Sequence, residues 1–443
     1  MPNIASYNAI DVGNIASING QDIAAGGGAY NPVTDSGTYT ETVPTSGLIK
    51  FGGIRYSGGT LSSDSSESYP RYAYGQQPVV NFSSDKDGNH LRVAESKSDF
   101  IHLTYGRYSA FGITSSGQMF EIGASSSYME GLDNNGNTWT QVTGVGDSDT
   151  GWTDVSSSYD GALAINSGKM YYIGLNSYGQ AGTGNQTHSF SSFTQVGSET
   201  DWQKVKRGRF YSLATKTSSN VLYSAGRNYT FMTGQGTSSG NTTSWTAIDD
   251  TNFTNSNITD FGINYDGGYL ITGGEVYVWG DNDSNERFGT NTTADIQVPT
   301  QTGKVGGTFQ TNWVTGAITQ NSMHLINTSG ELYHTGEGSA RRGDGSNTDA
   351  KDGNFVQIGT DTDWQEIYAD ATGVSNADYG ISALKGNKIF FWGYNQFGGV
   401  IDGTLGNTFT ATVILDQTLA AGNVWTPFLN RGAATQYAIA AIY

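Results

Sequence analysis

The sequence predicts an all-β protein built from one structural unit that recurs along the chain. The first observation is a phrase of the form apolar–aromatic–x–x–Gly, whose glycines lie between 51 and 57 residues apart. The second is an aromatic residue or Ile that opens a short strand-like run at the start of each unit. A repeat period of about fifty residues indicates an architecture in which each unit packs on its neighbours.

The units begin and end at regular places. Their seven beginnings are Phe100, Trp152, Trp202, Ile258, Trp313, Trp364 and Trp425. Their six endings are Gly123, Gly174, Gly226, Gly280, Gly336 and Gly393. The runs between them are rich in β-branched and aromatic residues and are separated by Gly, Asn, Ser and Asp, which is typical of strands and turns. Residues 327–330 (NTSG) are predicted to form a hairpin turn, and no long stretch has a helical apolar period.

Seven beginnings but six endings leave one unit incomplete at the C-terminus. Residues 48–52 (LIKFG) have the form of the missing ending. A ring of four-stranded sheets that closes in this way removes the exposed edges that an open array would present. We therefore predict a seven-bladed β-propeller at residues 48–443, closed by pairing of the N- and C-terminal strands. Six or eight blades are the alternatives, because the pattern of residues 53–97 does not show where its strands lie. Residues 48–97 would supply the closing strands and an insertion, residues 98–443 the repeats, and residues 1–47 an extended N-terminal anchoring arm.

Three segments resemble the repeat of the regulator-of-chromosome-condensation propeller family, leucine–tyrosine–x–tryptophan–glycine–x–asparagine followed by glycine–glutamine–leucine–glycine. They are residues 171–184 (YYIGLNSYGQAGTG), 391–398 (FWGYNQFG) and 278–282 (VWGDN). The resemblance covers roughly residues 97–443 and implies the propeller fold. The family's exchange factors use loops on one propeller face against a small GTPase, and none of those residues can be matched here.

The N-terminal segment 2–20 resembles the leader of structural proteins of tailed bacteriophages, particularly marine ones. Such leaders lie extended against a neighbouring virion protein. A weakly charged, Gly-rich arm buries little of its own surface, so it is expected to order against a partner. The arm residues expected to dock are Ile4, Tyr7, Ile10, Val12, Ile15 and Ile18.

The charge and composition of the chain argue against nucleic acid as a partner, against disulfides and against membrane insertion. The net charge is −18, from 40 acidic and 22 basic residues, which argues against binding to nucleic acid. The largest basic cluster lies within residues 204–209 (KVKRGR) and is expected to be the solvated face of a strand. The sequence has no Cys, no secretion signal and no apolar stretch of about 18 residues, so we expect neither disulfides nor membrane insertion.

Five aromatic residues follow the unit endings closely, in the same turn of different blades: Tyr128, Tyr178, Tyr229, Phe288 and Phe397. Packing of blade on blade is the favoured interpretation, and a rim of stacking platforms for sugar rings is the alternative. His324 and His334 flank a turn and are expected to face each other, but no third metal ligand accompanies them. We expect no metal, no cofactor and no catalytic residues, since no nucleophile–His–carboxylate arrangement stands out.

The function expected from these features is that of a non-enzymatic structural protein of a phage virion, assembled in the host cytoplasm. The arm would dock to a capsid or tail protein, and the propeller would be displayed as a decoration or as a module that binds a host-surface glycan or receptor. One alternative is a cellular propeller that acts as an interaction hub or small-GTPase exchange factor. Another is a carbohydrate-active propeller enzyme, which would need paired carboxylates.

Overall fold

The chain folds into strands joined by turns, and no helix occurs among the residues described by the computed structural model. In that part of the chain, nothing is therefore long and apolar enough to cross a membrane as a helix. The described residues are 17–18, 21–22, 48–51, 56–57, 60–61, 91–94, 100–105, 109–123, 140–158, 161–187, 189–248, 251–253, 257–282, 286–338, 342–369, 380–386, 388–393, 408–416 and 439–442.

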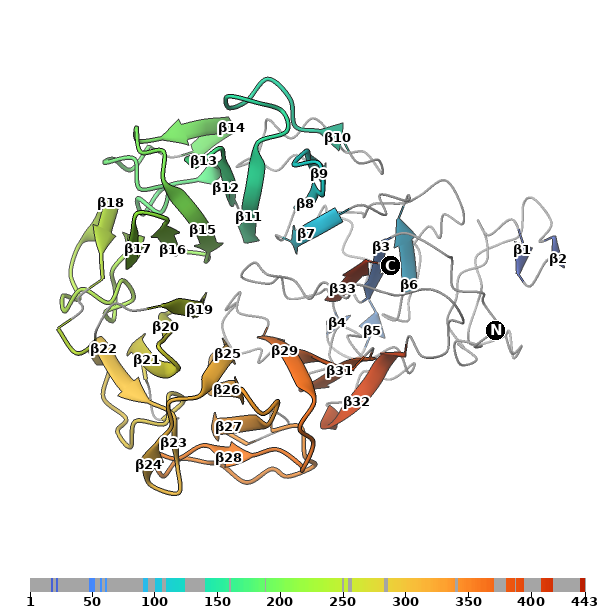
Figure 1. The fold of residues 1–443 in the computed structure, drawn as a ribbon, viewed down its shortest axis with the longest axis vertical. Helices are drawn as coiled ribbons and strands as arrows, with labels where there is room; N and C mark the ends of the chain where they lie inside the picture. Colours follow the sequence, from blue (N-terminus) through green and yellow to red (C-terminus); the bar gives the residue numbers. More distant parts are fainter. Residues whose placement is uncertain are drawn as a thin grey trace.

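Six four-stranded antiparallel sheets are arranged as blades around a common centre (Figure 1). In each blade four consecutive strands pair in chain order, from the innermost strand to the outermost. The first three blades are β7 (Phe100–Tyr105), β8 (Ser109–Thr114), β9 (Met119–Gly123) and β10 (Thr140–Gln141); β11 (Trp152–Ser158), β12 (Gly161–Asn166), β13 (Lys169–Leu175) and β14 (Ser189–Val196); and β15 (Trp202–Arg207), β16 (Tyr211–Lys216), β17 (Ser219–Arg227) and β18 (Asn241–Ala247).

The next three blades have the same plan. They are β19 (Ile258–Ile263), β20 (Gly267–Thr272), β21 (Glu275–Gly280) and β22 (Ile296–Thr302); β25 (Trp313–Ile318), β26 (Ser322–Asn327), β27 (Leu332–Gly336) and β28 (Val356–Gln357); and β29 (Trp364–Ala369), β30 (Ile381–Lys385), β31 (Lys388–Gly393) and β32 (Thr408–Asp416). The six inner strands begin at the first six predicted unit beginnings, and the turn at residues 327–330 joins β26 to β27 as predicted. The β-propeller fold is thereby confirmed.

The two ends of the chain meet in a separate three-stranded sheet. Its central strand β3 (Leu48–Phe51) pairs antiparallel with β33 (Ile439–Ile442) on one side and with β6 (Leu91–Ala94) on the other. The predicted pairing of N- and C-terminal strands is therefore confirmed. The predicted count of seven blades is wrong, because the described residues form six four-stranded blades and supply this sheet with three strands. The seventh predicted beginning, Trp425, lies outside the described residues.

Three short hairpins complete the described strands: β1 (Ser17–Ile18) with β2 (Gln21–Asp22), β4 (Tyr56–Ser57) with β5 (Thr60–Leu61), and β23 (Lys304–Val305) with β24 (Thr308–Phe309). Most of the predicted arm lies outside the described residues, and so do the docking candidates Ile4, Tyr7, Ile10, Val12 and Ile15. The remaining candidate, Ile18, belongs to β1. The arm therefore stays a prediction.

The two recurring phrases occur together because their aromatic residues pack edge to face. In one blade Trp152 lies 5.6 Å from Tyr171, measured between ring centres, and in the next Trp202 lies 5.5 Å from Tyr223. Three further blades repeat this contact, in the pairs Phe100–Phe120, Trp313–Tyr333 and Trp364–Phe390. T-shaped contacts of this kind add to the area that aromatic rings bury. Each pair thus fastens the innermost strand of a blade to its third strand.

Candidate functional site

Each innermost strand carries a β-bulge directly after its first residue. In β11, Trp152 pairs with Asn166 and Asp154 with Ile165, so Thr153 is the extra residue. The same register shift occurs in β7, β15, β19, β25 and β29. A bulge bends the strand and changes the direction of the side chains that follow it. The first residue of each inner strand is thereby kept in the core, while the third can face the centre of the ring.

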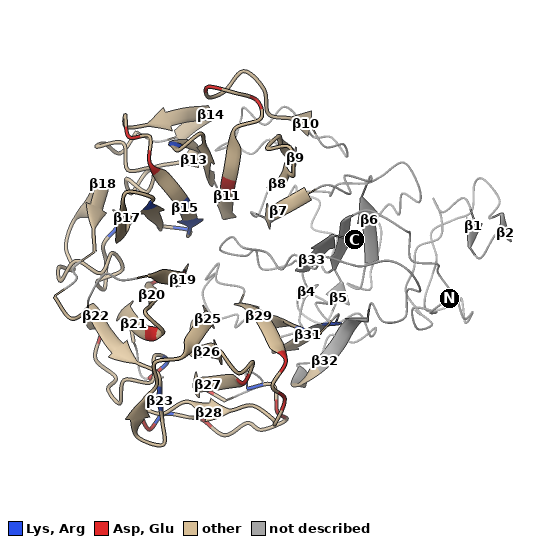
Figure 2. Cartoon of the chain, in the orientation of Figure 1, with Lys and Arg blue, Asp and Glu red and all other residues tan. Residues whose placement is uncertain are grey.

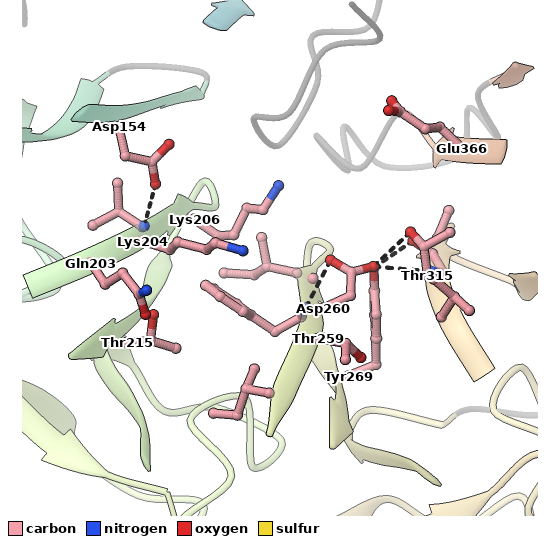
Figure 3. Close-up of a pocket in the computed structure, with 18 of the residues that line it drawn as sticks. Asp154, Gln203, Lys204, Lys206, Thr215, Thr259, Asp260, Tyr269, Thr315 and Glu366 are labelled. Carbon is pink, nitrogen blue, oxygen red and sulfur yellow. Dashed lines mark hydrogen bonds between the residues drawn. The ribbon is translucent and has the colours of Figure 1, made fainter. Parts of the chain in front are cut away.

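The third residues of the six inner strands line one central cavity of about 630 Å³ (Figure 3). We call these residues the channel ring. Its members, in blade order, are His102, Asp154, Lys204, Asp260, Thr315 and Glu366. A concave site with several convergent polar groups is the usual form of a binding site, so this cavity is the candidate functional site.

Two members of the channel ring form a pair between neighbouring blades. Nδ1 of His102 lies 3.3 Å from Oδ1 of Asp154. Nε2 of His102 donates to the carbonyl of Val155 at 2.7 Å, since a carbonyl can only accept. The second carboxylate oxygen of Asp154 accepts from the backbone N–H of Val205 at 2.8 Å. These contacts join three successive inner strands, β7, β11 and β15.

Asp260 joins two further blades through a larger set of hydrogen bonds. Its Oδ1 accepts from the backbone N–H of Phe261 at 2.9 Å. Its Oδ2 accepts from the hydroxyls of Tyr269 and Thr315, each at 2.8 Å, and from the N–H of Gly316 at 3.0 Å. Hydrogen bonds to a charged acceptor are stronger than those between neutral groups. The carboxylate is therefore committed to holding β19 against β25.

Tyr269 is expected to make the free energy of unfolding decrease as the pH rises in the alkaline range. Burial raises the pKa of Tyr269 well above its usual value, and the charge of Asp260 adds to the rise. A tyrosine in the unfolded chain titrates near pH 10. Above that pH the unfolded chain loses a proton that the folded chain keeps, so stability is complete below about pH 10 and falls as pH rises further, by up to about 1.4 kcal/mol per pH unit for this group.

We therefore predict that Tyr269→Phe makes the fall of stability above pH 10 shallower by about 1.4 kcal/mol per pH unit. Urea unfolding at several values between pH 9 and pH 11.5 measures the slope. Tyr229→Phe serves as the matched control substitution, because Tyr229 is 61% exposed and lies outside the hydrogen bonds around Asp260. An identical slope in wild type and Tyr269→Phe would show that Tyr269 ionises as readily in the folded chain as in the unfolded one.

The basic cluster within residues 204–209 is distributed over three environments. Lys204 and Lys206 line the central cavity. Figure 2 shows basic residues on β15 where this strand faces the centre of the ring. Arg207 is fully buried, and Arg209 is partly buried in the turn that follows the strand. The expectation of a uniformly solvated face is therefore wrong, because the strand that carries the cluster lines the ring instead of the outer surface.

The five predicted rim aromatics differ in exposure where the structure describes them. Phe288 is fully buried in the core, Tyr178 is partly buried and Tyr229 is exposed. Tyr128 and Phe397 lie outside the described residues. A buried ring cannot stack on a sugar, so Phe288 is excluded from the glycan-platform hypothesis. The hypothesis remains a proposal for the other four residues.

Arg227 packs among these aromatic residues. Its guanidinium carbon lies 5.4 Å from the ring centre of Tyr178, 4.9 Å from that of Phe210 and 5.1 Å from that of Tyr229. Tyr178 and Phe210 meet edge to face at 5.2 Å. These contacts cross from one blade to the next, which fits the packing interpretation of Tyr178.

His324 and His334 face each other across β26 and β27, as predicted. Nδ1 of His334 lies 3.2 Å from Nε2 of His324, and both side chains are fully buried. Among the described residues, no group of three or more His, Cys, Asp or Glu side chains is placed to hold a metal ion.

The sequence interpretation missed the channel ring, although a signal for it was present. The clearest copies of the opening phrase, residues 201–205 and 363–367, hold Lys204 and Glu366 two places after their Trp. Aligning the unit beginnings would have shown a polar or charged residue at this position in all six blades. The sequence could not show that a bulge turns this residue toward the centre.

Comparison with known proteins supports the fold. No model of a known protein family matches the sequence, and no curated protein matches it. Among solved structures, human WBSCR16 is similar with a TM-score of 0.68 and 15% identity, over 90% of this chain and 99% of that chain. Yeast RCC1 (Prp20), in a complex with Kap60, has a TM-score of 0.64 and 11% identity, over 90% and 89%. Prp20p from Saccharomyces cerevisiae has a TM-score of 0.61 and 11% identity, over 90% and 92%.

These similarities identify the fold as an RCC1-like β-propeller, as the repeat residues implied. At such low identities they show the fold alone. They offer no support for the resemblance of the leader to phage virion proteins.

Proposed function

We propose that this chain is a non-enzymatic binding platform and that a partner protein docks over the central cavity. The channel ring carries the proposal. Its position holds His, Asp, Lys, Asp, Thr and Glu in the six blades, whereas the residue two places earlier is aromatic in five of the six. Packing accounts for the repeated aromatic, and hydrogen bonds between blades account for His102, Asp154, Asp260 and Thr315. Neither accounts for a lysine at the same position of β15, whose ammonium group has no such contact among the described residues. Variable polar residues on a constant scaffold are typical of binding surfaces.

Propellers of this fold that bind proteins support the proposal. The structure of yeast RCC1 (Prp20) was solved in a complex with Kap60. Prp20p has been characterised for its binding to Gsp1p and histones. These are properties of those proteins, and they make a protein partner a reasonable class for this one. Exchange of nucleotide on a small GTPase is a narrower form of the proposal, and faster nucleotide release from a GTPase in the presence of this chain would establish it.

A photo-crosslinking amino acid at Gln203 tests the platform. Gln203 is exposed at the bulge of β15 and lines the central cavity. In an extract of the cells that produce the protein, we expect it to crosslink one dominant protein. The matched control carries the crosslinker at Thr246, which is exposed on the outer strand β18. Mass spectrometry that finds the same products at both positions, or none at Gln203, would contradict docking over the cavity.

The virion role is a separate proposal that depends on the leader at residues 2–20, which lies almost entirely outside the described residues. In that role the partner would be a capsid or tail protein, or a host-surface glycan or receptor. Neighbouring portal, capsid or tail genes, or detection of the chain in purified virions, would support it. The binding platform fits this setting as well as a cellular one, because the channel ring does not depend on where the protein is found.

A further inference from the structure

Lys204 differs from the other charged members of the channel ring. Its side chain is exposed to the central cavity. In the part of the chain that the structure describes, no carboxylate lies within ion-pair distance of its ammonium group. An ammonium group offers three hydrogen-bond donors and a compact positive charge. Lys204 is therefore available to an anionic group that enters the cavity.

The carboxylates on either side of Lys204 in the ring are already engaged. Asp154 is held by His102 and by the N–H of Val205. Asp260 accepts four hydrogen bonds from its own blade and from the next. Turning either carboxylate toward Lys204 would break contacts between blades, so neither neutralises the lysine.

A second lysine lies on the same side of the same strand. Side chains two residues apart in a strand share one face, and Lys206 lines the same cavity. Figure 3 shows both lysine side chains between Asp154 and Asp260. In a protein of net charge −18, this strand is a local exception that would select where an acidic group binds.

We infer that the central cavity is an anion-binding site built on Lys204, and that its ligand is a carboxylate on a protruding acidic segment of the partner protein. The inference rests on the proposed function, because it names the group by which the partner is recognised. The volume of about 630 Å³ admits the tip of a peptide segment as well as a small anion. Phosphate shares the chemistry of a carboxylate here, so the experiment has to separate the two.

The test is a titration of the full chain with a fluorescent peptide that contains Glu residues, beside the same peptide with Gln in their place. We expect the Glu peptide to bind and the Gln peptide to fail. Lys204→Gln should weaken binding at least tenfold, and Lys204→Arg should retain most of it. Lys351→Gln is the control, because Lys351 pairs with Asp349 at 2.9 Å on the surface, and it should change nothing.

Two results would overturn the inference. Equal affinity of the Glu peptide for wild type and Lys204→Gln would show that Lys204 is not the anchor. Tighter binding of inorganic phosphate than of the Glu peptide, again lost in Lys204→Gln, would assign the site to a phosphate-bearing ligand and reject the carboxylate.

Failure of the inference can be told apart from failure of the platform. If Gln203 crosslinks its partner equally well when Lys204 is replaced by Gln, the platform stands and the anion site is wrong. If the Glu peptide binds through Lys204 but Gln203 crosslinks no dominant protein, the anion site stands and the platform is wrong.

Discussion

Replacing Gly280 with alanine is expected to destabilise the protein by about 4 kcal/mol. The backbone at Gly280 has a φ of +106°, which side chains rarely tolerate. A Cβ atom there would lie 2.4 Å from the carbonyl oxygen of Asp266 and 2.5 Å from the Cα of Gly267. Both neighbours are backbone atoms, at the first residue of β20 and at the residue before it, so no side chain can rotate to relieve the clash. Urea unfolding followed by tryptophan fluorescence measures the loss.

The matched control is Gly240→Ala. Gly240 also has a positive φ, of +80°, but a Cβ there would meet no atom within 4 Å. Only the backbone cost of about 1–2 kcal/mol should remain. If both substitutions cost the same, close packing of the third strand against the second would not be the reason for the glycine.

The same physical reason explains why the repeat was visible in the sequence. Gly280 ends its unit, and the endings of four other blades have φ values between 95° and 126°: Gly174, Gly226, Gly336 and Gly393. At Gly226 a Cβ would lie 2.5 Å from the carbonyl oxygen of Phe210 and from the Cα of Tyr211. Because the positive φ and the close backbone approach recur in these blades, glycine recurs at the same place in the sequence. The aromatic at each unit beginning recurs because it packs on the aromatic of the ending phrase.

Other parts of the structure have no recurring residue that indicates them in the sequence. The outermost strands, such as β18 (Asn241–Ala247), are polar and mostly accessible to solvent, so their pattern resembles that of a turn. The number of blades was miscounted because a unit beginning was taken to imply a complete sheet. Sequence alone does not tell how many strands the meeting ends of a chain supply.

The channel ring was hidden for a different reason. A strand alternates its side chains between two faces, so a residue two places after a buried Trp is expected to point the same way as the Trp. The bulge after the first residue breaks this rule in each inner strand. Asp154 and Lys204 thus reach the cavity although the simple alternation would place them in the core. No glycine indicates either bulge in the sequence, because the extra residues are Thr153 and Gln203.

Asp260→Ala is expected to destabilise the protein by about 3 kcal/mol, because it removes the acceptor shared by Tyr269, Thr315 and the N–H of Gly316. The hydroxyl of Thr315 and the N–H of Gly316 are fixed on the neighbouring blade and lose this acceptor, whereas the hydroxyl of Tyr269 can still donate to the carbonyl of Gly316. Urea unfolding of Asp260→Ala and of Thr315→Val measures the effect. Thr315→Val removes one of the bonds and should cost about 1 kcal/mol.

The control for this experiment is Asp147→Ala. Asp147 is an exposed carboxylate that pairs with Lys169 at 2.8 Å, and an exposed pair of this kind contributes less than about 1 kcal/mol. A loss below 1 kcal/mol in Asp260→Ala as well would mean that the ring carboxylates are not committed to joining the blades. Asp260 would then be free to neutralise Lys204, and the charge that we assign to the partner's carboxylate would already be satisfied within the propeller.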